Sequence, residues 1–180
     1  PLSPMALQLP DFAGERSQDK RQRLSEELKA AKQDAVILTA PDSIAWIANI
    51  RGGDVPYTPF CLMFAILHAG GGLDLFVDPR KATASVRNAL DGGITISTPD
   101  AFETALQALG KAKATVRLDM SSAAHAIHHI LENSGAAITR GDDPCAKPKA
   151  RKNETELNGI RAAHIRDGAA LSRFLCWLDR

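Results

Sequence analysis

The sequence predicts a three-layer α/β/α sandwich, an α/β fold in which helices cover both faces of a mixed sheet of five or six strands, with one further helix protruding at the C-terminal end. Two apolar runs joined by the glycine-rich segment 70–72 indicate an antiparallel hairpin. After this hairpin, strand-like and helix-like segments alternate as they do in βαβ units, which implies parallel strands in the same sheet. In segment 153–180, apolar residues recur at helical spacing up to the last residue, which predicts the protruding helix.

The first part of the chain is expected to form an arm, a helix and a central strand. Residues 1–10 carry three prolines and no periodicity, so they predict an extended arm. The charged segment 17–33 has Leu24 and Leu28 at helical spacing. The compact apolar run 35–39 that follows is typical of a buried strand.

A short helix is expected next, because Asp42 or Ser43 can cap a segment that carries Trp46. We expect this helix to end at the glycine pair 52–53, and an irregular polar loop to follow. The apolar runs 61–67 and 73–77 are the two strands of the hairpin. Further helices are expected at 86–90, 99–109 and 122–133, and further strands at 94–96, 116–120 and 137–140.

Composition limits the classes of function. A chain of 180 residues fits one domain with its own core. Lys and Arg number 22 against 21 Asp and Glu, so the net charge of +1 supplies no field for nucleic acid or for acidic membranes. The longest apolar run, 59–67, is too short to cross a bilayer. We therefore expect neither nucleic-acid nor membrane partners.

The cysteines favour a reducing environment. Cys61, Cys145 and Cys176 are odd in number, widely spaced and without a Cys-x-x-Cys pair, which argues against a disulfide framework and a structural zinc site. A cytoplasmic location is the simpler interpretation. We expect Cys61 and Cys176 to be buried small hydrophobic residues, whereas the pattern around Cys145 decides nothing.

Histidines and glycines that suggest a ligand site have simpler explanations. His125, His128 and His129 lie on one expected helix, and His125 and His129 are four residues apart, but the apolar stripe of that helix lies opposite, so we expect a solvated face for His125, His129 and Glu132. The glycines at 70–72 and 92–93 do not stand between a strand and a helix, as a phosphate loop requires, and turn chemistry explains them. No metal-binding or cofactor-binding residue is assigned.

Carboxylates are scattered along the chain, and none is assigned to catalysis. The four that attract notice lie at expected strand ends or in loops, where carboxylates commonly cap helices or face water. These residues are Asp42, Asp54, Asp78 and Asp119.

One loop concentrates hydrogen-bonding and aromatic groups: Trp46, Asn49, Arg51, Asp54 and Tyr57. Two interpretations remain open. The Arg and Asn side chains can hold the loop by bonding backbone carbonyls, which we favour, or the loop can serve as an interface or a substrate-access loop.

Three blocks of the sequence resemble the aminopeptidase P family. The first, at Gly14 and Asp19-Lys20, is similar to the entry into that family's middle domain. The second is similar to the interior of the same domain, and the third to its passage into the catalytic domain. The second block comprises Ile44-Ala45-Trp46, Asn49-Ile50-Arg51-Gly52, Asp54-Val55 and Pro59, and the third comprises Pro148-Lys149-Ala150, Lys152-Asn153, Glu156, residues 163–167, Ala170-Leu171 and Trp177-Leu178.

The resemblance implies a fold and an activity for the parent protein. The fold would be the creatinase N-terminal, ribonuclease H-like type. The parent would be a metallopeptidase that removes the N-terminal residue from peptides with proline second, using water bridged between two divalent metals, usually manganese. In the family, two Asp, one His and two Glu of a pita-bread catalytic domain bind these metals, and all five would lie beyond Arg180. The resemblance thus implies no catalytic, metal or cofactor residue in this chain.

The implied domain organisation is an arm at 1–14, a creatinase N-terminal-like domain at 15–147, and a linker with the first helix of a catalytic domain at 148–180. The helix that is still running at Arg180 predicts that the chain is a piece of a longer protein. Its partners would be its own catalytic domain, a preceding N-terminal domain, proline-containing peptides and, in a homodimer, a second copy.

The leading hypothesis is a noncatalytic domain of a Xaa-Pro aminopeptidase that restricts access to the active site and supports assembly of domains and subunits. Two alternatives remain: a domain of a creatinase-like amidinohydrolase, and a noncatalytic interaction module.

Overall fold

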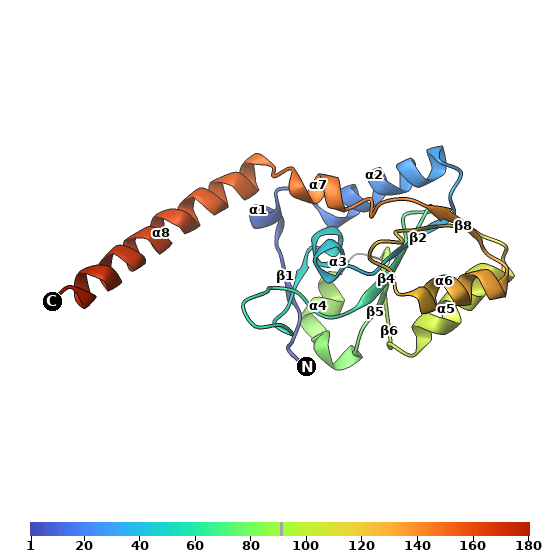
Figure 1. Cartoon of the computed structure of the whole chain (residues 1–180), viewed down its shortest axis with the longest axis horizontal. Helices are drawn as coiled ribbons and strands as arrows, with labels where there is room; N and C mark the ends of the chain where they lie inside the picture. The colour runs from blue at the N-terminus through green and yellow to red at the C-terminus, as the bar shows by residue number, and fades with distance from the viewer. Residues whose placement is uncertain (91) are drawn as a thin grey trace.

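The computed structural model describes residues 1–90 and 92–180, and within them a mixed sheet of six strands forms the centre of the molecule (Figure 1). The strands lie in the order β6-β5-β4-β2-β7-β8. This arrangement confirms the predicted three-layer sandwich. The strands are β2 (Ala35–Leu38), β4 (Phe64–His68), β5 (Leu73–Phe76), β6 (Ile94–Ser97), β7 (Thr115–Leu118) and β8 (Ala137–Arg140).

Pairing in the sheet follows the pattern expected from the sequence. The predicted hairpin is present, because β4 pairs antiparallel with β5. Strand β2 pairs antiparallel with β4, where Ile37 lies opposite Ile66, and parallel with β7. The pairs β5-β6 and β7-β8 are parallel, as βαβ connections require. All four residues of β2 are buried, because helices cover both faces of this central strand.

Helices cover both faces of the sheet (Figure 1). The buried apolar side chains form two separate clusters, one on each face. On one face, α2 (Ser17–Ala30), α3 (Pro41–Ala48) and α4 (Ala84–Ala89) contribute Leu24, Ile47 and Val86. On the other face, α5 (Ala101–Lys111) and α6 (His125–Ser134) contribute Leu106 and Leu131. A 3-10 turn, η1 (Pro79–Lys81), connects β5 to the segment before α4.

The N-terminal arm is extended, as expected, and it packs on the domain. Its strand β1 (Ala6–Leu7) pairs antiparallel with β3 (Ile50–Arg51). Met5 is 4% exposed, and its backbone N–H donates to the carbonyl of Lys81 at 2.8 Å. A short helix, α1 (Pro10–Ala13), follows the arm.

Several boundaries differ from the prediction. Helix α3 begins at Pro41 without a side-chain cap, so neither Asp42 nor Ser43 caps it. It ends at Asn49, which adopts the left-handed conformation with φ 53°, and not at the glycine pair. The strand predicted from residue 61 begins at Phe64, because the preceding backbone bonds to the loop instead of the sheet. A short helix, α7 (Ala146–Ala150), spans the point where the linker was expected to begin, at residue 148.

The C-terminal helix α8 (Glu154–Leu178) projects away from the sheet (Figure 1). Asn153 caps it as predicted, because its Oδ1 accepts from the N–H of Glu156 at 2.9 Å and Glu156 Oε2 accepts from the N–H of Asn153 at 3.0 Å. Beyond the first turns, its apolar side chains are exposed, for example Ile165 at 74%. Cys176 is exposed too, so the prediction that it is buried was wrong for this chain, whereas Cys61 and Cys145 are buried.

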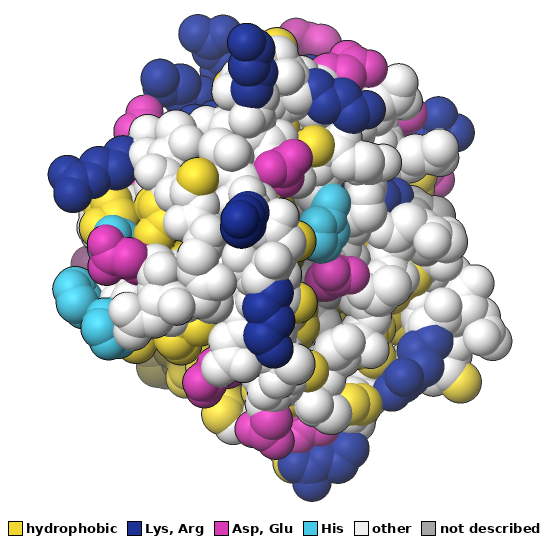
Figure 2. Space-filling view, turned by 90° about the vertical axis from the view of Figure 1, so that its right-hand side faces the viewer, with side chains coloured by type: hydrophobic (Ala, Val, Ile, Leu, Met, Phe, Trp, Pro, Cys, Tyr) yellow, Lys and Arg dark blue, Asp and Glu magenta, His cyan; other side chains and the backbone are white. Residues whose placement is uncertain are grey.

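The surface offers no region dominated by one charge on the face that Figure 2 shows, where basic and acidic side chains are interspersed. On α6, His125 and His129 are exposed while Ile127 and Leu131 are buried, which confirms the predicted solvated face. Within the described residues, no helix combines the length and the apolar character needed to cross a membrane.

Candidate functional site at the root of helix α8

Two cations hold the C-terminal end of α3. The Nζ of Lys20 donates to the carbonyl oxygen of Trp46 at 3.0 Å and to Oδ1 of Asn49 at 2.8 Å. The Nη1 of Arg51 donates to the carbonyl oxygen of Ala45 at 3.2 Å. Carbonyls in the last turn of a helix carry partial negative charge, so cations stabilise them. The favoured interpretation of Arg51 and Asn49, that they hold the loop through backbone groups, matches this geometry.

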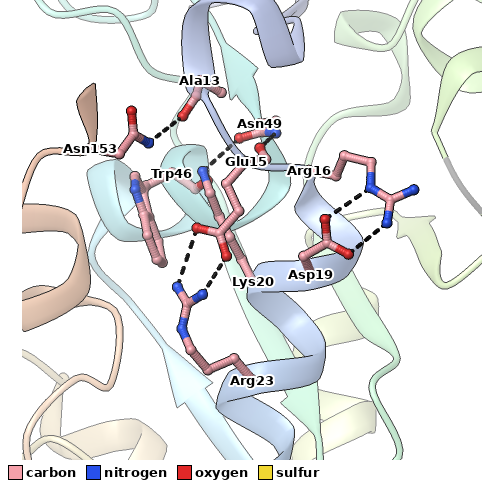
Figure 3. Close-up of polar contacts among 9 residues, drawn as sticks. All are labelled: Ala13, Glu15, Arg16, Asp19, Lys20, Arg23, Trp46, Asn49 and Asn153. Carbon is pink, nitrogen blue, oxygen red and sulfur yellow. Dashed lines mark hydrogen bonds and ion pairs between the residues drawn. The ribbon is translucent and has the colours of Figure 1, made fainter. Parts of the chain in front are cut away.

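Lys20 is a buried lysine that lies against an aromatic ring. Its residue is 1% exposed, and its ammonium lies 4.4 Å from the centroid of the Trp46 ring (Figure 3). Within the part of the chain that the structure describes, no carboxylate lies at ion-pair distance from this ammonium. Burial lowers the pKa of Lys20 from 10.5 to about 8, although Glu15 and Glu156 oppose the change. Two neutral oxygens and one aromatic face thus hold a cation.

The same cluster joins α3 to α8 (Figure 3). Asn49 Nδ2 donates to the carbonyl oxygen of Glu15 at 2.8 Å. Two residues earlier, the carbonyl of Ala13 accepts from Nδ2 of Asn153, also at 2.8 Å. Gly14 packs so closely there that an added Cβ would lie 2.4 Å from Oδ1 of Asn153. The N-cap of α8 is therefore bonded to the turn that Asn49 holds, and this contact defines what we term the α8 root: Ala13–Glu15, Asn49 and Asn153.

A buried ion pair fixes the loop after β3. Asp54 and Lys81 form it with side chains that are 0% and 5% exposed. Asp54 Oδ2 also accepts from the N–H of Leu62 at 2.7 Å. Burial alone would raise the pKa of Asp54, but the bonds from Lys81 and Leu62 bring it below its ordinary value. Asp54 therefore connects the loop to η1, a contact that the sequence pattern did not predict.

The predicted site residues do not converge on one point. Trp46, Asn49 and Arg51 surround the end of α3, and Asp54 lies in its own buried pair. Tyr57 is fully exposed at a loop position with φ 61°. Four of the five thus make contacts within the domain, and one faces solvent.

Sequence reasoning did not assign Lys20 to the site. A signal was present, because Lys20 lies four residues before Leu24 and eight before Leu28, on the stripe that faces the core. A lysine on such a stripe predicts either a partner or a buried cation.

Two grooves flank the α8 root. The larger, with a volume of about 650 Å³, lies between α2 and the segment 142–151. The smaller, about 370 Å³, lies between the loop after β3 and the segment that leads into α8. Trp46 and Glu156 line both grooves, so the indole and this carboxylate form the ridge between them.

The residues present do not fit a metal centre. Within residues 1–90 and 92–180, no group of three or more His, Cys, Asp or Glu is placed to hold one metal ion. His68 with Asp74, at 2.7 Å, and His128 with Glu132, at 3.8 Å, are pairs only. Catalytic zinc sites normally use three protein ligands, so a pair of side chains is too few.

The fold is an α/β domain in which Lys20, Asn49, Arg51 and Asn153 bond to backbone carbonyls of the same chain. The chain belongs to the creatinase/prolidase N-terminal domain family, whose model matches residues 1–156. The sequence-based resemblance is thereby confirmed.

Named relatives cover the chain almost completely. The probable Xaa-Pro aminopeptidase P of Arthroderma gypseum is 31% identical over 185 residues, which are 99% of this chain and 29% of the relative. That of Aspergillus clavatus is 34% identical over 174 residues, which are 93% of this chain and 26% of the relative. The chain therefore spans less than a third of the length of these relatives.

Solved structures agree with this placement. The X-prolyl aminopeptidase of Caenorhabditis elegans, described as a cytosolic enzyme with a di-nuclear active site, matches with a TM-score of 0.90 and 28% identity over 98% of this chain and 29% of its own. The Xaa-Pro dipeptidase of Bacillus anthracis matches with a TM-score of 0.68 over 90% of this chain and 44% of its own, and at 14% identity it shows the fold alone.

Proposed function

We propose that this chain is a noncatalytic domain of a larger, cytoplasmic Xaa-Pro aminopeptidase, a hydrolase that removes the N-terminal residue from peptides with proline in second position. The observation that carries the proposal is the match to the C. elegans X-prolyl aminopeptidase, with a TM-score of 0.90 over 98% of this chain. The names of the curated relatives, each a probable Xaa-Pro aminopeptidase P, support the same activity. They favour a peptidase over an amidinohydrolase.

The domain's contribution is structural. Its polar residues hold the end of α3 and the N-cap of α8, and these contacts set the direction in which the chain leaves the sandwich. Two divalent metals, of which manganese is the expected identity, belong to another part of the larger protein, where they would activate water for hydrolysis. No step of that hydrolysis involves a residue of this chain.

Helix α8 is the connection to that catalytic part. Its exposed apolar side chains fit a contact with a following domain, because contiguous exposed apolar surface commonly marks an interaction site. The loop that contains Tyr57, the arm and the two grooves lie on the domain that this helix would bring beside the active site. In that position the domain restricts access of long substrates and supports domain and subunit assembly, including a homodimer.

A comparison of substrate lengths tests the access role. The full-length protein and a variant lacking residues 1–152 are assayed with a short and a long Xaa-Pro peptide, after both proteins are shown to be folded. We expect the deletion to raise the ratio of kcat/KM for the long peptide to that for the short one. An unchanged ratio in a folded, active variant contradicts access restriction.

A further inference from the structure

The smaller groove beside the α8 root is lined by more basic than acidic side chains. Three cations line it, Arg51, Lys149 and Lys152, against two carboxylates, Asp42 and Glu156. Asp42 is already paired with Lys149, and the Glu156 carboxylate accepts from the backbone N–H of Asn153 at 3.0 Å. The two carboxylates are thus engaged within the domain.

Arg51 and Lys152 are the two cations of this groove for which the described residues supply no ion pair. Within residues 1–90 and 92–180, neither has an acidic side chain at ion-pair distance. The Nη1 of Arg51 donates to the carbonyls of Ala45 and Ile50. Within the same described residues, its Nη2 and Nε donate no hydrogen bond. Among the residues that the structure describes, the one bond that Lys152 donates is to the backbone carbonyl of Lys149. A half-buried guanidinium without an anion is costly, so a carboxylate there is favourable.

The uncharged part of the lining is mostly apolar. Ala45, Trp46, Pro59 and Phe60 form it next to the two cations, and Thr58 adds one hydroxyl. Burial lowers the pKa of Arg51, and the Glu156 carboxylate offsets only part of that effect, which is consistent with an arginine that has room for an anion. A volume of about 370 Å³ is in the range of small-molecule sites and too small for a folded partner.

We propose that this groove binds the C-terminal carboxylate of a short peptide that ends in an apolar residue. The guanidinium of Arg51 and the ammonium of Lys152 bind the carboxylate, and Trp46, Pro59 and Phe60 contact the apolar side chain. The inference does not depend on the proposed aminopeptidase activity, because it rests on the charges and contacts of this chain alone.

A matched pair of probes tests the proposal on the 180-residue chain. N-acetyl-leucine carries the free carboxylate, and N-acetyl-leucinamide has nearly the same shape but carries a neutral carboxamide in its place. Binding is followed by NMR through the indole N–H of Trp46, in a Trp177→Phe background so that one indole reports. We expect the acid to bind about tenfold tighter than the amide, which corresponds to about 1.4 kcal/mol.

Two lysine variants locate the site. Lys152 is exposed, so Lys152→Gln should leave the fold intact and weaken binding of the acid by about threefold to fivefold, a typical effect of a partly exposed charge. Lys147→Gln, in the neighbouring groove, is the matched control and should change nothing. Arg51→Lys keeps the positive charge and loses the planar guanidinium. It should also weaken binding of the acid but leave binding of the amide unchanged.

Three outcomes overturn the proposal. One is equal binding of acid and amide, which would assign the groove to apolar contact only. Another is an equal effect of Lys152→Gln and Lys147→Gln, which would reduce the result to general surface charge. The third is the absence of saturable binding of the free acid, the result expected if these cations instead meet an acidic side chain of another protein segment.

Discussion

The ammonium of Lys20 lies 4.4 Å from the centroid of the Trp46 ring in a position that is 1% exposed. The same ammonium donates to Oδ1 of Asn49 at 2.8 Å, and Asn49 holds the turn to which the N-cap of α8 is bonded. A cation on helix α2 is thus connected through two hydrogen bonds to the turn from which α8 departs. The stability of this corner should therefore depend on the charge of a lysine.

The lowered pKa of Lys20 predicts that the folded state becomes more stable as the pH rises above 8. Its pKa is lowered from 10.5 to about 8 in the folded state, so between these values the unfolded chain binds more protons than the folded chain. The free energy of unfolding then rises with pH across this window. One pKa unit corresponds to about 1.4 kcal/mol, so the gain approaches ~3 kcal/mol.

Urea unfolding from pH 7.5 to 10.5 measures this gain for the wild type and for Lys20→Met. The difference in free energy of unfolding between the two proteins should shift in favour of the wild type as pH rises, because only the wild type carries the titrating group. Lys111→Met, on the exposed side of α5, is the control, and its free energy of unfolding should change with pH as that of the wild type does. If the free energy of unfolding of Lys20→Met followed the wild type at every pH, the lowered pKa would not belong to Lys20.

The Asp54–Lys81 pair predicts strong coupling in a double-mutant cycle. Removal of one partner leaves a buried charge, so Asp54→Asn and Lys81→Met should each lower the free energy of unfolding by about 3–5 kcal/mol. The double variant should lose clearly less free energy of unfolding than the two single variants lose together. Additive effects in chemical unfolding would mean that the two side chains do not interact.

The same pair predicts a loss of stability in acid. The pKa of Asp54 lies below its ordinary value of 3.8, so its contribution is complete above that value and is lost as the pH falls further. Unfolding curves at pH 5 and pH 3 should differ more in the wild type than in the Asp54→Asn/Lys81→Met double variant. An equal acid sensitivity would assign the loss to other carboxylates.

The cap of α8 predicts a local effect at the α8 root. Asn153→Ala removes the bond to the N–H of Glu156 and the bond to the carbonyl of Ala13, and it should cost about 1–2 kcal/mol. Hydrogen exchange should accelerate in the first turn of α8 and in the turn at Ala13. Asn158→Ala, an exposed position one turn further along the helix, is the control. Equal exchange rates in both variants would contradict a capping role.

The exposed face of α8 predicts self-association of the isolated chain. Leu171, Phe174 and Leu178 are 52% to 58% exposed, and apolar surface of this kind is normally covered. The apparent mass in sedimentation should rise with concentration, and Leu171→Gln with Phe174→Gln should reduce the rise. A monomer at all concentrations would show that this face does not bind a second copy.

Much of the fold follows from local patterns. The apolar run at 35–38 and the glycine turn at 70–72 predicted the central strand and the hairpin, because burial on both faces and tight turns leave strong sequence signals. The capping box of Asn153 and Glu156 predicted the start of α8. The arm was less predictable, because the pairing of β1 with β3 joins residues more than forty positions apart.

The site was predicted in part, for a physical reason. Asn49, Arg51 and Asp54 lie in one loop and could be grouped by their proximity in sequence. Their partners Lys20 and Lys81 come from an α-helix and a 3-10 turn that are 29 and 27 residues away, and only the folded chain brings them together. A sequence pattern identifies the residues with polar groups but not the carbonyl or carboxylate that each one meets.

One pair of assays tests the central claim most directly. The full-length protein and the purified 180-residue chain are each incubated with manganese and a Xaa-Pro peptide, and release of the N-terminal residue is measured. If this chain is the noncatalytic domain of a Xaa-Pro aminopeptidase, the full-length protein releases the residue and the chain alone does not. Turnover by the chain alone, or none by an intact full-length protein, would contradict the account.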